Sequence, residues 1–220
     1  ADKANRIVVL LNKLADYAQS EEAKKIIIQW WEGKFEPLAN HKMTIGQQWR
    51  AIVKAHTLKS ISNEEKQTLF DKQAEVDKSD TQKGHKLTCE AMKASKEEFQ
   101  KLYDSYFDKN NKLSASLKRS SMSGWNNKIH EEWIEAEYLD KFFNDLPAAA
   151  ESLDPDAAIM LVEYLTPNVK DLKKLIEKFE TTIPKLAKSE RVANEAKMSL
   201  DMLKRRQAAY DFFESTRPKL

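Results

Sequence analysis

Glycine is scarce in this 220-residue chain, which has only Gly33, Gly46, Gly84 and Gly124. Their wide separation excludes the G-x-G-x-x-G fingerprint of dinucleotide-binding folds and the glycine-rich loop that cradles phosphates. Asn-Gly and Asp-Gly pairs, which favour two-residue hairpin turns, are also missing. The composition is 33% charged and rich in good helix formers. We therefore expect an all-α protein.

The chain also has a single cysteine, a small net charge and no long apolar run. Cys89 is the only cysteine, so no disulfide can form within the chain, and we expect a reducing compartment, most simply the cytoplasm. The 37 basic and 35 acidic residues leave a net charge of +2, which is too balanced to predict a nucleic-acid partner or a membrane surface. No 18-residue stretch is apolar, and residues 1–6 do not resemble the start of a signal peptide. We expect neither a membrane span nor a targeting segment.

Apolar residues recur at helical spacing along most of the chain. The first two stripes, which predict a leading helical hairpin over residues 1–45, are Ile7, Leu10, Leu11, Leu14 and Ala18, then Ile27, Trp30, Trp31 and Phe35. Helix starts are predicted after Ser20, at Asp154-Pro155, and at three S/T-x-x-E/Q capping boxes, namely Thr44 with Gln47, Ser62 with Glu65, and Ser95 with Glu98. About ten helices with short connections, antiparallel to their neighbours, predict a single domain over 1–220. They form either an irregular bundle or, as we prefer, a curved stack like a HEAT superhelix.

Helix ends are predicted mainly from glycine, proline and polar runs. We expect a polar corner from Asp77 to Gly84, a break around Gly124, a helix end at Pro147 and a new helix start at Asn168. A last helix is expected from about residue 189 to residue 214.

Local catalytic patterns are weak. The closest approach to the zinc motif HExxH is His130-Glu131-Glu132-Trp133-Ile134, in which Ile134 stands where the second ligand would be, so we predict no metal site. Cys89 has His85 four residues before it, on the same side of a helix, where it could act as a base. No oxyanion-hole turn follows Cys89, so we expect a small, partly buried residue there. We predict no catalytic residue.

Three groups of side chains leave alternatives open. The pairs Trp30/Trp31 and Phe142/Phe143 predict either a binding groove or helices that are buried on two sides, and the second is favoured. The lysine run Lys170, Lys173, Lys174 and Lys178 is typical of a solvated helix face.

From residue 46 onward the chain carries an ordered set of short motifs. They are Gln48-Trp49-Arg50-Ala51-Ile52-Val53, then Asp77-Lys78-Ser79-Asp80-Thr81-Gln82-Lys83-Gly84, then Met122-Ser123-Gly124-Trp125-Asn126, and last Tyr138-Leu139-Asp140-Lys141-Phe142-Phe143. In this order they resemble the C-terminal helical domain of zinc aminopeptidases of the membrane-alanyl and puromycin-sensitive (aminopeptidase N-like) family. The HExxH-x18-E zinc site and the Gly-x-Met-Glu-Asn motif of that family are not in the chain.

The resemblance implies a noncatalytic helical domain that caps the catalytic domain of the same chain and forms a peptide-substrate chamber with it. Zinc would then belong to the parent enzyme, which removes N-terminal amino acids from peptides, and not to this region. Arg119, Trp125 and Asn126 are the chamber candidates that the resemblance suggests; the alternative is a surface arginine beside loop-packing residues. The alternative function is a free-standing helical-repeat scaffold that binds a protein or peptide. An enzyme that uses Cys89 and His85 is the least favoured hypothesis.

Overall fold

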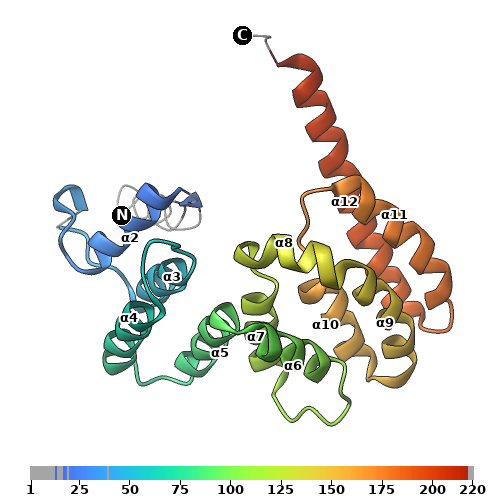
Figure 1. Ribbon diagram of the computed structural model, residues 1–220, viewed down its shortest axis with the longest axis horizontal. Helices are drawn as coiled ribbons and strands as arrows, with labels where there is room; N and C mark the ends of the chain where they lie inside the picture. Colours follow the sequence, from blue (N-terminus) through green and yellow to red (C-terminus); the bar gives the residue numbers. More distant parts are fainter. Residues whose placement is uncertain (1–12, 14–16, 19, 39, 218–220) are drawn as a thin grey trace, which may run out of the picture. The chain divides into compact units, whose positions relative to one another are not determined.

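The three-dimensional structure is a computed structural model that describes residue 13 and residues 17–18, 20–38 and 40–217. All secondary-structure elements in these ranges are helical, which confirms the all-α fold class (Figure 1). Contacts group the chain into two compact units, Ala1–Lys93 and Ala94–Leu220, called unit 1 and unit 2 below. The single domain and the superhelical stacking stay predictions. No helix within the described ranges combines the length and the apolar character needed to cross a membrane.

The described residues of unit 1 form four α-helices. They are α2 (Glu21–Trp31), α3 (Ile45–His56), α4 (Asn63–Val76) and α5 (Thr81–Lys93), with a short 3₁₀ turn η1 (Glu36–Leu38) between the first two. Helix α2 ends in a Schellman motif, in which the Gly33 amide donates to Trp30 O and the Lys34 amide to Gln29 O. Gly33 takes a φ of 72°, the left-handed conformation that this motif requires.

The predicted caps are present. Ser20 accepts a hydrogen bond from the Ala23 amide, and all three capping boxes form with both of their reciprocal bonds. In the first box, the Thr44 amide donates to Gln47 Oε1 at 2.8 Å. The stripe of Ile7, Leu10, Leu11 and Leu14 lies outside the described residues, so the leading hairpin stays a prediction, although Ala18 is buried.

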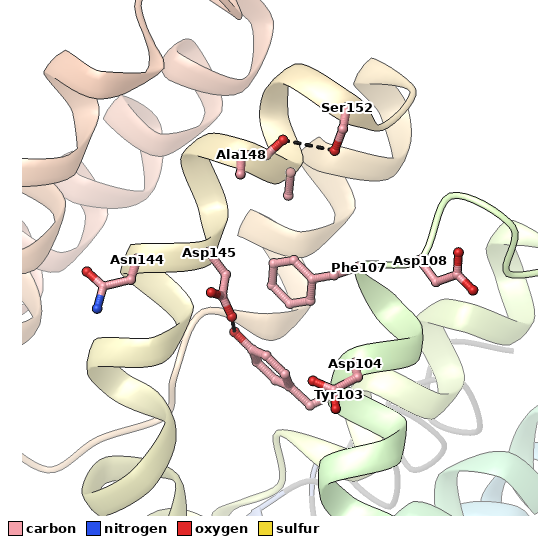
Figure 2. Close-up of a pocket in the computed structure, with 9 residues that line it drawn as sticks. Tyr103, Asp104, Phe107, Asp108, Asn144, Asp145, Ala148 and Ser152 are labelled. Atoms are coloured by element: carbon pink, nitrogen blue, oxygen red, sulfur yellow. Dashed lines mark hydrogen bonds between the residues drawn. The ribbon is translucent and has the colours of Figure 1, made fainter.

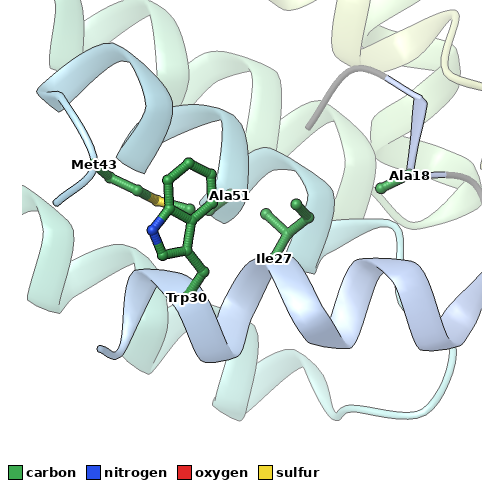
Figure 3. Close-up of a cluster of buried hydrophobic side chains, with 5 residues drawn as sticks. All are labelled: Ala18, Ile27, Trp30, Met43 and Ala51. Atoms are coloured by element: carbon green, nitrogen blue, oxygen red, sulfur yellow. The ribbon is translucent and has the colours of Figure 1, made fainter. Parts of the chain in front are cut away.

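The two adjacent tryptophans of α2 contact different partners. Trp30 is buried in a cluster with Ile27, Met43 and Ala51, and its indole Nε1 donates to His41 O at 2.6 Å (Figure 3). Trp31 is half-buried and donates instead to Gln73 Oε1 of α4 at 2.8 Å. These contacts agree with a helix that is buried on two sides, the favoured alternative for this pair.

A second cluster of unit 1 is built around Trp49. Its ring lies 5.3 Å from that of Phe70, and its Nε1 donates to Asp77 Oδ2 at 2.6 Å. The hydrogen bond from Trp49, followed by those from Ser79, holds the pKa of Asp77 at about 2. This bond joins the first two motifs of the family resemblance and fixes the corner between α4 and α5.

Unit 2 contains the remaining helices. They are α6 (Lys96–Tyr106), α7 (Ala115–Trp125), η2 (Lys128–His130), α8 (Glu131–Trp133), the π-helical turn η3 (Ile134–Tyr138), α9 (Leu139–Ser152), α10 (Pro155–Leu165), α11 (Leu172–Thr182), η4 (Ile183–Leu186) and α12 (Glu190–Thr216). Helix α12 packs on α10 and α11, and α10 also packs on α7 and α9. As predicted, Asp154 caps α10 with Pro155 in its first turn.

Aromatic rings fill the centre of unit 2. The ring centroid of Trp125 lies 4.3 Å from that of Phe99 and 5.0 Å from that of Tyr138. Phe142 and Phe143 are both buried, and Phe143 meets Phe179 edge to face at 5.0 Å. The burial of this second aromatic pair is also confirmed, because successive side chains point to different sides of α9 and both sides are covered.

Three predicted helix boundaries are wrong. Pro147 lies inside α9 and removes one backbone hydrogen bond of that helix. The helix continues past it because burial of Leu146, Ala149 and Ala150 offsets the loss of this bond. Gly84 lies inside α5 rather than at the corner before it, whereas the break expected around Gly124 is present, because α7 ends at Trp125. Helix α11 begins after Asp171 rather than at Asn168, because the Asp171 carboxylate accepts from the Lys173 and Lys174 amides.

Candidate functional site

Two of the three chamber candidates lie on one side of α7. Arg119 is exposed, and its guanidinium carbon lies 6.0 Å from the ring centroid of Tyr164 on α10. Asn126 follows α7, and its Nδ2 donates to Tyr164 O and Thr166 O at 3.1 and 2.7 Å. The structure therefore brings both residues to the C-terminal end of α10.

Trp125, the third candidate, offers no surface in this structure. Its side chain is completely buried, and its Nε1 donates to Phe99 O at 3.0 Å. Asn126 also has a structural task, because its Oδ1 accepts from the Asn168 amide at 3.1 Å. Together these contacts fix the connection between α10 and α11. A role of Arg119, Trp125 or Asn126 in a substrate chamber stays a prediction.

Asn126 lies at one edge of a groove of about 370 Å³. The groove is lined by the C-terminal part of α10, the connection to α11, the first turns of α11 and the middle of α12, through Val162, Glu163, Thr166, Pro167, Asn168, Val169, Leu172, Leu175, Ser199, Met202, Leu203 and Arg206. Leu172 and Leu203 are partly exposed in it, while Glu163 and Arg206 are exposed charged members of the lining. The groove thus combines an apolar wall with one charge of each sign.

A second hollow of unit 2 lies between α6 and α9 and differs from the groove in the charge of its lining. That hollow has about 350 Å³ and contains the carboxylates of Asp104, Asp108 and Asp145 (Figure 2). Its centre is already occupied by internal contacts, because Tyr103 Oη donates to Asp145 at 3.1 Å and Lys141 Nζ lies 3.0 Å from the same carboxylate.

The other contacts in this hollow are also internal to the fold. Lys141 Nζ is also 4.8 Å from the ring centroid of Tyr103, a cation–π distance. Burial, followed by the negative charge of Asp145, raises the pKa of the Tyr103 phenol well above its usual value, so the hydroxyl stays protonated and continues to donate. This arrangement holds α6 against α9, and we assign it to the fold.

Within the described residues of unit 1, a hollow of about 400 Å³ lies between α2, α4 and the connection around Leu58. Ile28, Ile61 and Leu69 supply apolar surface, and Lys25 and Lys72 lie among charged neighbours.

Cys89 and His85 do not form a nucleophile and base. The Cys89 side chain is 1% exposed, and burial raises the pKa of its thiol to about 12. The His85 ring stacks on Trp49, with centroids 4.7 Å apart and planes 13° apart. Burial lowers the pKa of His85, although the charge of Asp77 opposes this. A thiol that is buried and protonated is unreactive.

Two other groups singled out in the sequence are the metal-ligating residues and the lysine run. Within the described ranges, no set of three or more His, Cys, Asp or Glu side chains could hold a metal ion. The solvated lysine face is confirmed at Lys173 and Lys174, which are exposed, whereas Lys178 Nζ pairs with Asp140 at 2.6 Å and Lys170 Nζ with Glu132 at 3.3 Å.

The groove itself was not predicted from the sequence. Glu163 and Arg206 are 43 positions apart, and neither belongs to a motif. Only Asn126 was a candidate in advance, through the family resemblance. Comparisons with protein-family models, with curated proteins and with solved structures found no match to this chain.

Proposed function

We propose that this chain is a noncatalytic helical domain that binds a protein or peptide segment in the groove of unit 2. The observation that carries the proposal is the lining of that groove, which combines partly exposed leucines with the exposed side chains of Glu163 and Arg206. Apolar surface provides binding free energy, and the two charges provide orientation. The buried, protonated Cys89 supports a binding role over an enzymatic one.

The groove suits an extended segment more than a compact small molecule. Residues 166–169 of the connection between α10 and α11 belong to its lining, and Asn126 bonds there to Thr166 O and to the Asn168 amide, as well as to Tyr164 O in α10. A fixed lining lowers the ordering cost of binding, because the residues that meet the ligand are already in place. The opposite charges at Glu163 and Arg206 favour a ligand that carries one basic and one acidic or carboxylate group.

The family resemblance supplies a more specific form of the same proposal. In that form the partner is the catalytic domain of a zinc aminopeptidase, the groove faces the peptide chamber, and zinc is bound by the catalytic domain. The Trp49–Asp77 bond and the Trp125–Tyr138 contact favour it, because residues of all four resembling motifs pack together within their own units. We also propose a cytoplasmic location, where a lone thiol stays reduced.

The groove is tested by selecting peptides from a phage-displayed library on the immobilised full chain. The selected peptides should combine apolar with charged residues and should bind the Leu203→Glu variant at least about tenfold more weakly, because the new carboxylate lies in the apolar wall. A Glu163→Lys variant should also weaken binding, because it reverses a charge of the lining while leaving the apolar side chains unchanged. Lys185→Glu, exposed in η4 and outside the lining, is the matched control.

Two results would contradict the groove proposal: an empty selection, or selected peptides that bind both groove variants as well as they bind the control. The aminopeptidase form has a separate test, in which the chain is mixed with the catalytic domain of such an enzyme. Binding should raise the melting temperature of that domain, while the chain alone with added zinc should release no amino acid from an aminoacyl reporter. Zinc-dependent turnover by the chain alone would refute a noncatalytic role.

A further inference from the structure

The six methionines of this chain fall into two groups by their exposure to solvent. Four of them, which are between 1% and 8% exposed, are Met43, Met92, Met122 and Met160. Met198 and Met202, both on α12, are 61% and 62% exposed. A thioether inside a core is shielded from dissolved oxidants, whereas an exposed one is open to them. The structure thus separates two reactive methionines from four protected ones.

The two exposed methionines lie one turn apart but have different surroundings. The face by which α12 packs on α10 and α11 carries the buried residues Val192, Ala193 and Ala196. At about 100° per residue, Met198 points almost directly away from this face, while Met202 lies nearer to its margin. Met202 belongs to the lining of the groove in unit 2, and Met198 is outside that lining. Equal exposure therefore goes with unequal positions.

We infer that Met202 is a site of reversible oxidation by hydroperoxides, and that its sulfoxide lowers the affinity of the groove for a peptide. The thioether sulfur attacks one oxygen of hydrogen peroxide with its lone pair, and the O–O bond breaks. The transferred oxygen gives its proton to the departing hydroxide, which leaves as water. Sulfur is oxidised to the sulfoxide, and the peroxide is reduced. The Cys89 thiol does not compete, because it is buried and protonated.

The sulfoxide changes the chemistry of the groove wall. Methionine is a flexible apolar side chain, and oxidation makes it polar and adds a strong hydrogen-bond acceptor. A ligand that packs against the apolar wall beside Leu203 would bury this acceptor, which costs free energy if it has no donor. Arg206, one turn further along α12, can donate to the new oxygen, but that bond withdraws the guanidinium from an acidic group of the ligand. Both outcomes weaken binding.

The two halves of this inference have different foundations. The selectivity of oxidation rests on exposure alone, whereas the effect on affinity rests on the proposed peptide groove. Met198 is a built-in control for the second half, because it is as exposed as Met202 and lies on the same helix but does not line the groove.

Oxidation is mapped by brief treatment of the native full chain with hydrogen peroxide, removal of the peroxide with catalase, and mass spectrometry of tryptic peptides. Met198 and Met202 fall in one tryptic peptide, residues 198–204, so fragment ions assign the added oxygen to each. Both should be oxidised well before the four buried methionines, and the difference should vanish in urea. Oxidation of Met202 no faster than that of the buried methionines would overturn the inference.

Binding is measured with the phage-selected peptides, which are added only after the peroxide has been removed. The oxidised native chain and oxidised Met198→Leu should bind at least about fivefold more weakly than before treatment. Met202→Leu should keep its affinity, because leucine has a similar volume and no sulfur. Treatment with the two methionine sulfoxide reductases, one for each sulfoxide epimer, should restore binding to the oxidised native chain.

Failure of this inference differs from failure of the groove. If peptides bind the untreated chain but oxidation weakens the native chain and Met202→Leu equally, or weakens neither, the groove stands and the role of Met202 is refuted. A loss that the reductases do not reverse would refute reversibility. If no peptide binds the untreated chain, the groove and the affinity effect both fall, and the oxidation map alone decides whether Met202 is a modification site.

Discussion

His56 makes unit 1 sensitive to mild acid. The side chain is 1% exposed, and its Nδ1–H donates to Ile52 O at 2.9 Å. Its other ring nitrogen, Nε2, is buried and accepts no hydrogen bond from the described residues. Burial, together with the positive charges of Lys93 and Lys66, lowers the pKa of His56 from 6.5 to about 4, although the bond to Ile52 opposes the shift.

The direction of the effect follows from proton binding. Below pH 6.5 the unfolded chain protonates His56, whereas the folded chain keeps it neutral until the pH reaches about 4. Folding stability is therefore full above pH 6.5 and falls as the pH drops from 6.5 to 4. At 1.36 kcal/mol for each pKa unit, the loss from this residue is about 3 kcal/mol. That is a large share of the roughly 5–15 kcal/mol that stabilises a typical domain.

Urea unfolding at pH 7 and at pH 4 measures this loss, with the NMR amide signals of α3 reporting on unit 1. His56→Asn keeps a donor near Ile52 O but cannot titrate, so it should lack the additional loss of about 3 kcal/mol between the two pH values. Carboxylates contribute the same pH dependence to both proteins and cancel in the comparison. His41→Asn is the matched control, because His41 is only half-buried.

The reasoning would be refuted by equal pH dependence in the native chain and His56→Asn. A direct NMR titration provides an independent check. If the ring protons of His56 titrated near 6.5 in the folded protein, the ring would not be desolvated as the structure shows.

Three further predictions concern packing, capping and thiol chemistry. Phe99→Ala should lower the free energy of unfolding by about 3–5 kcal/mol in a denaturant titration, because Phe99 is completely buried among Trp125, Tyr138 and their neighbours; a loss below 1 kcal/mol would contradict this packing. Ser95→Ala should cost about 1 kcal/mol by the same measurement, since it removes the cap of α6, and Ser95→Asn should restore most of the loss. Cys89 should react with a thiol reagent only after unfolding, and rapid labelling at neutral pH would disprove the burial of its thiol.

Local signals predicted the helix starts well. Each capping box involves two residues three positions apart, and its hydrogen bonds close within one turn, so nothing distant has to be known. Thr44, Ser62 and Ser95 all cap as their sequences indicate. Aromatic pairs were also interpreted correctly, because two adjacent large side chains point to different sides of any helix.

Helix ends were predicted less well, since a glycine or proline ends a helix only where packing does not favour its continuation. Pro147 removes one backbone bond, yet Leu146 and Ala150 are buried on either side of it and hold α9 together. The family resemblance suggested Trp125 and Asn126 as chamber candidates. In the structure, Trp125 fills the core of unit 2 and Asn126 fixes the connection after α10.

The scarcity of glycine, the balanced charge and the helical periodicity were enough to determine an all-α chain and most of its helix starts, because these depend on interactions within one or two turns. Tertiary structure decided which residues share a surface. Glu163 and Arg206 line one groove although they are far apart in sequence, and α12 presents a second apolar side only because its first side is already covered by α10 and α11. Exposure depends on the distant segments that cover each side chain, and the sequence of a single helix does not contain that information.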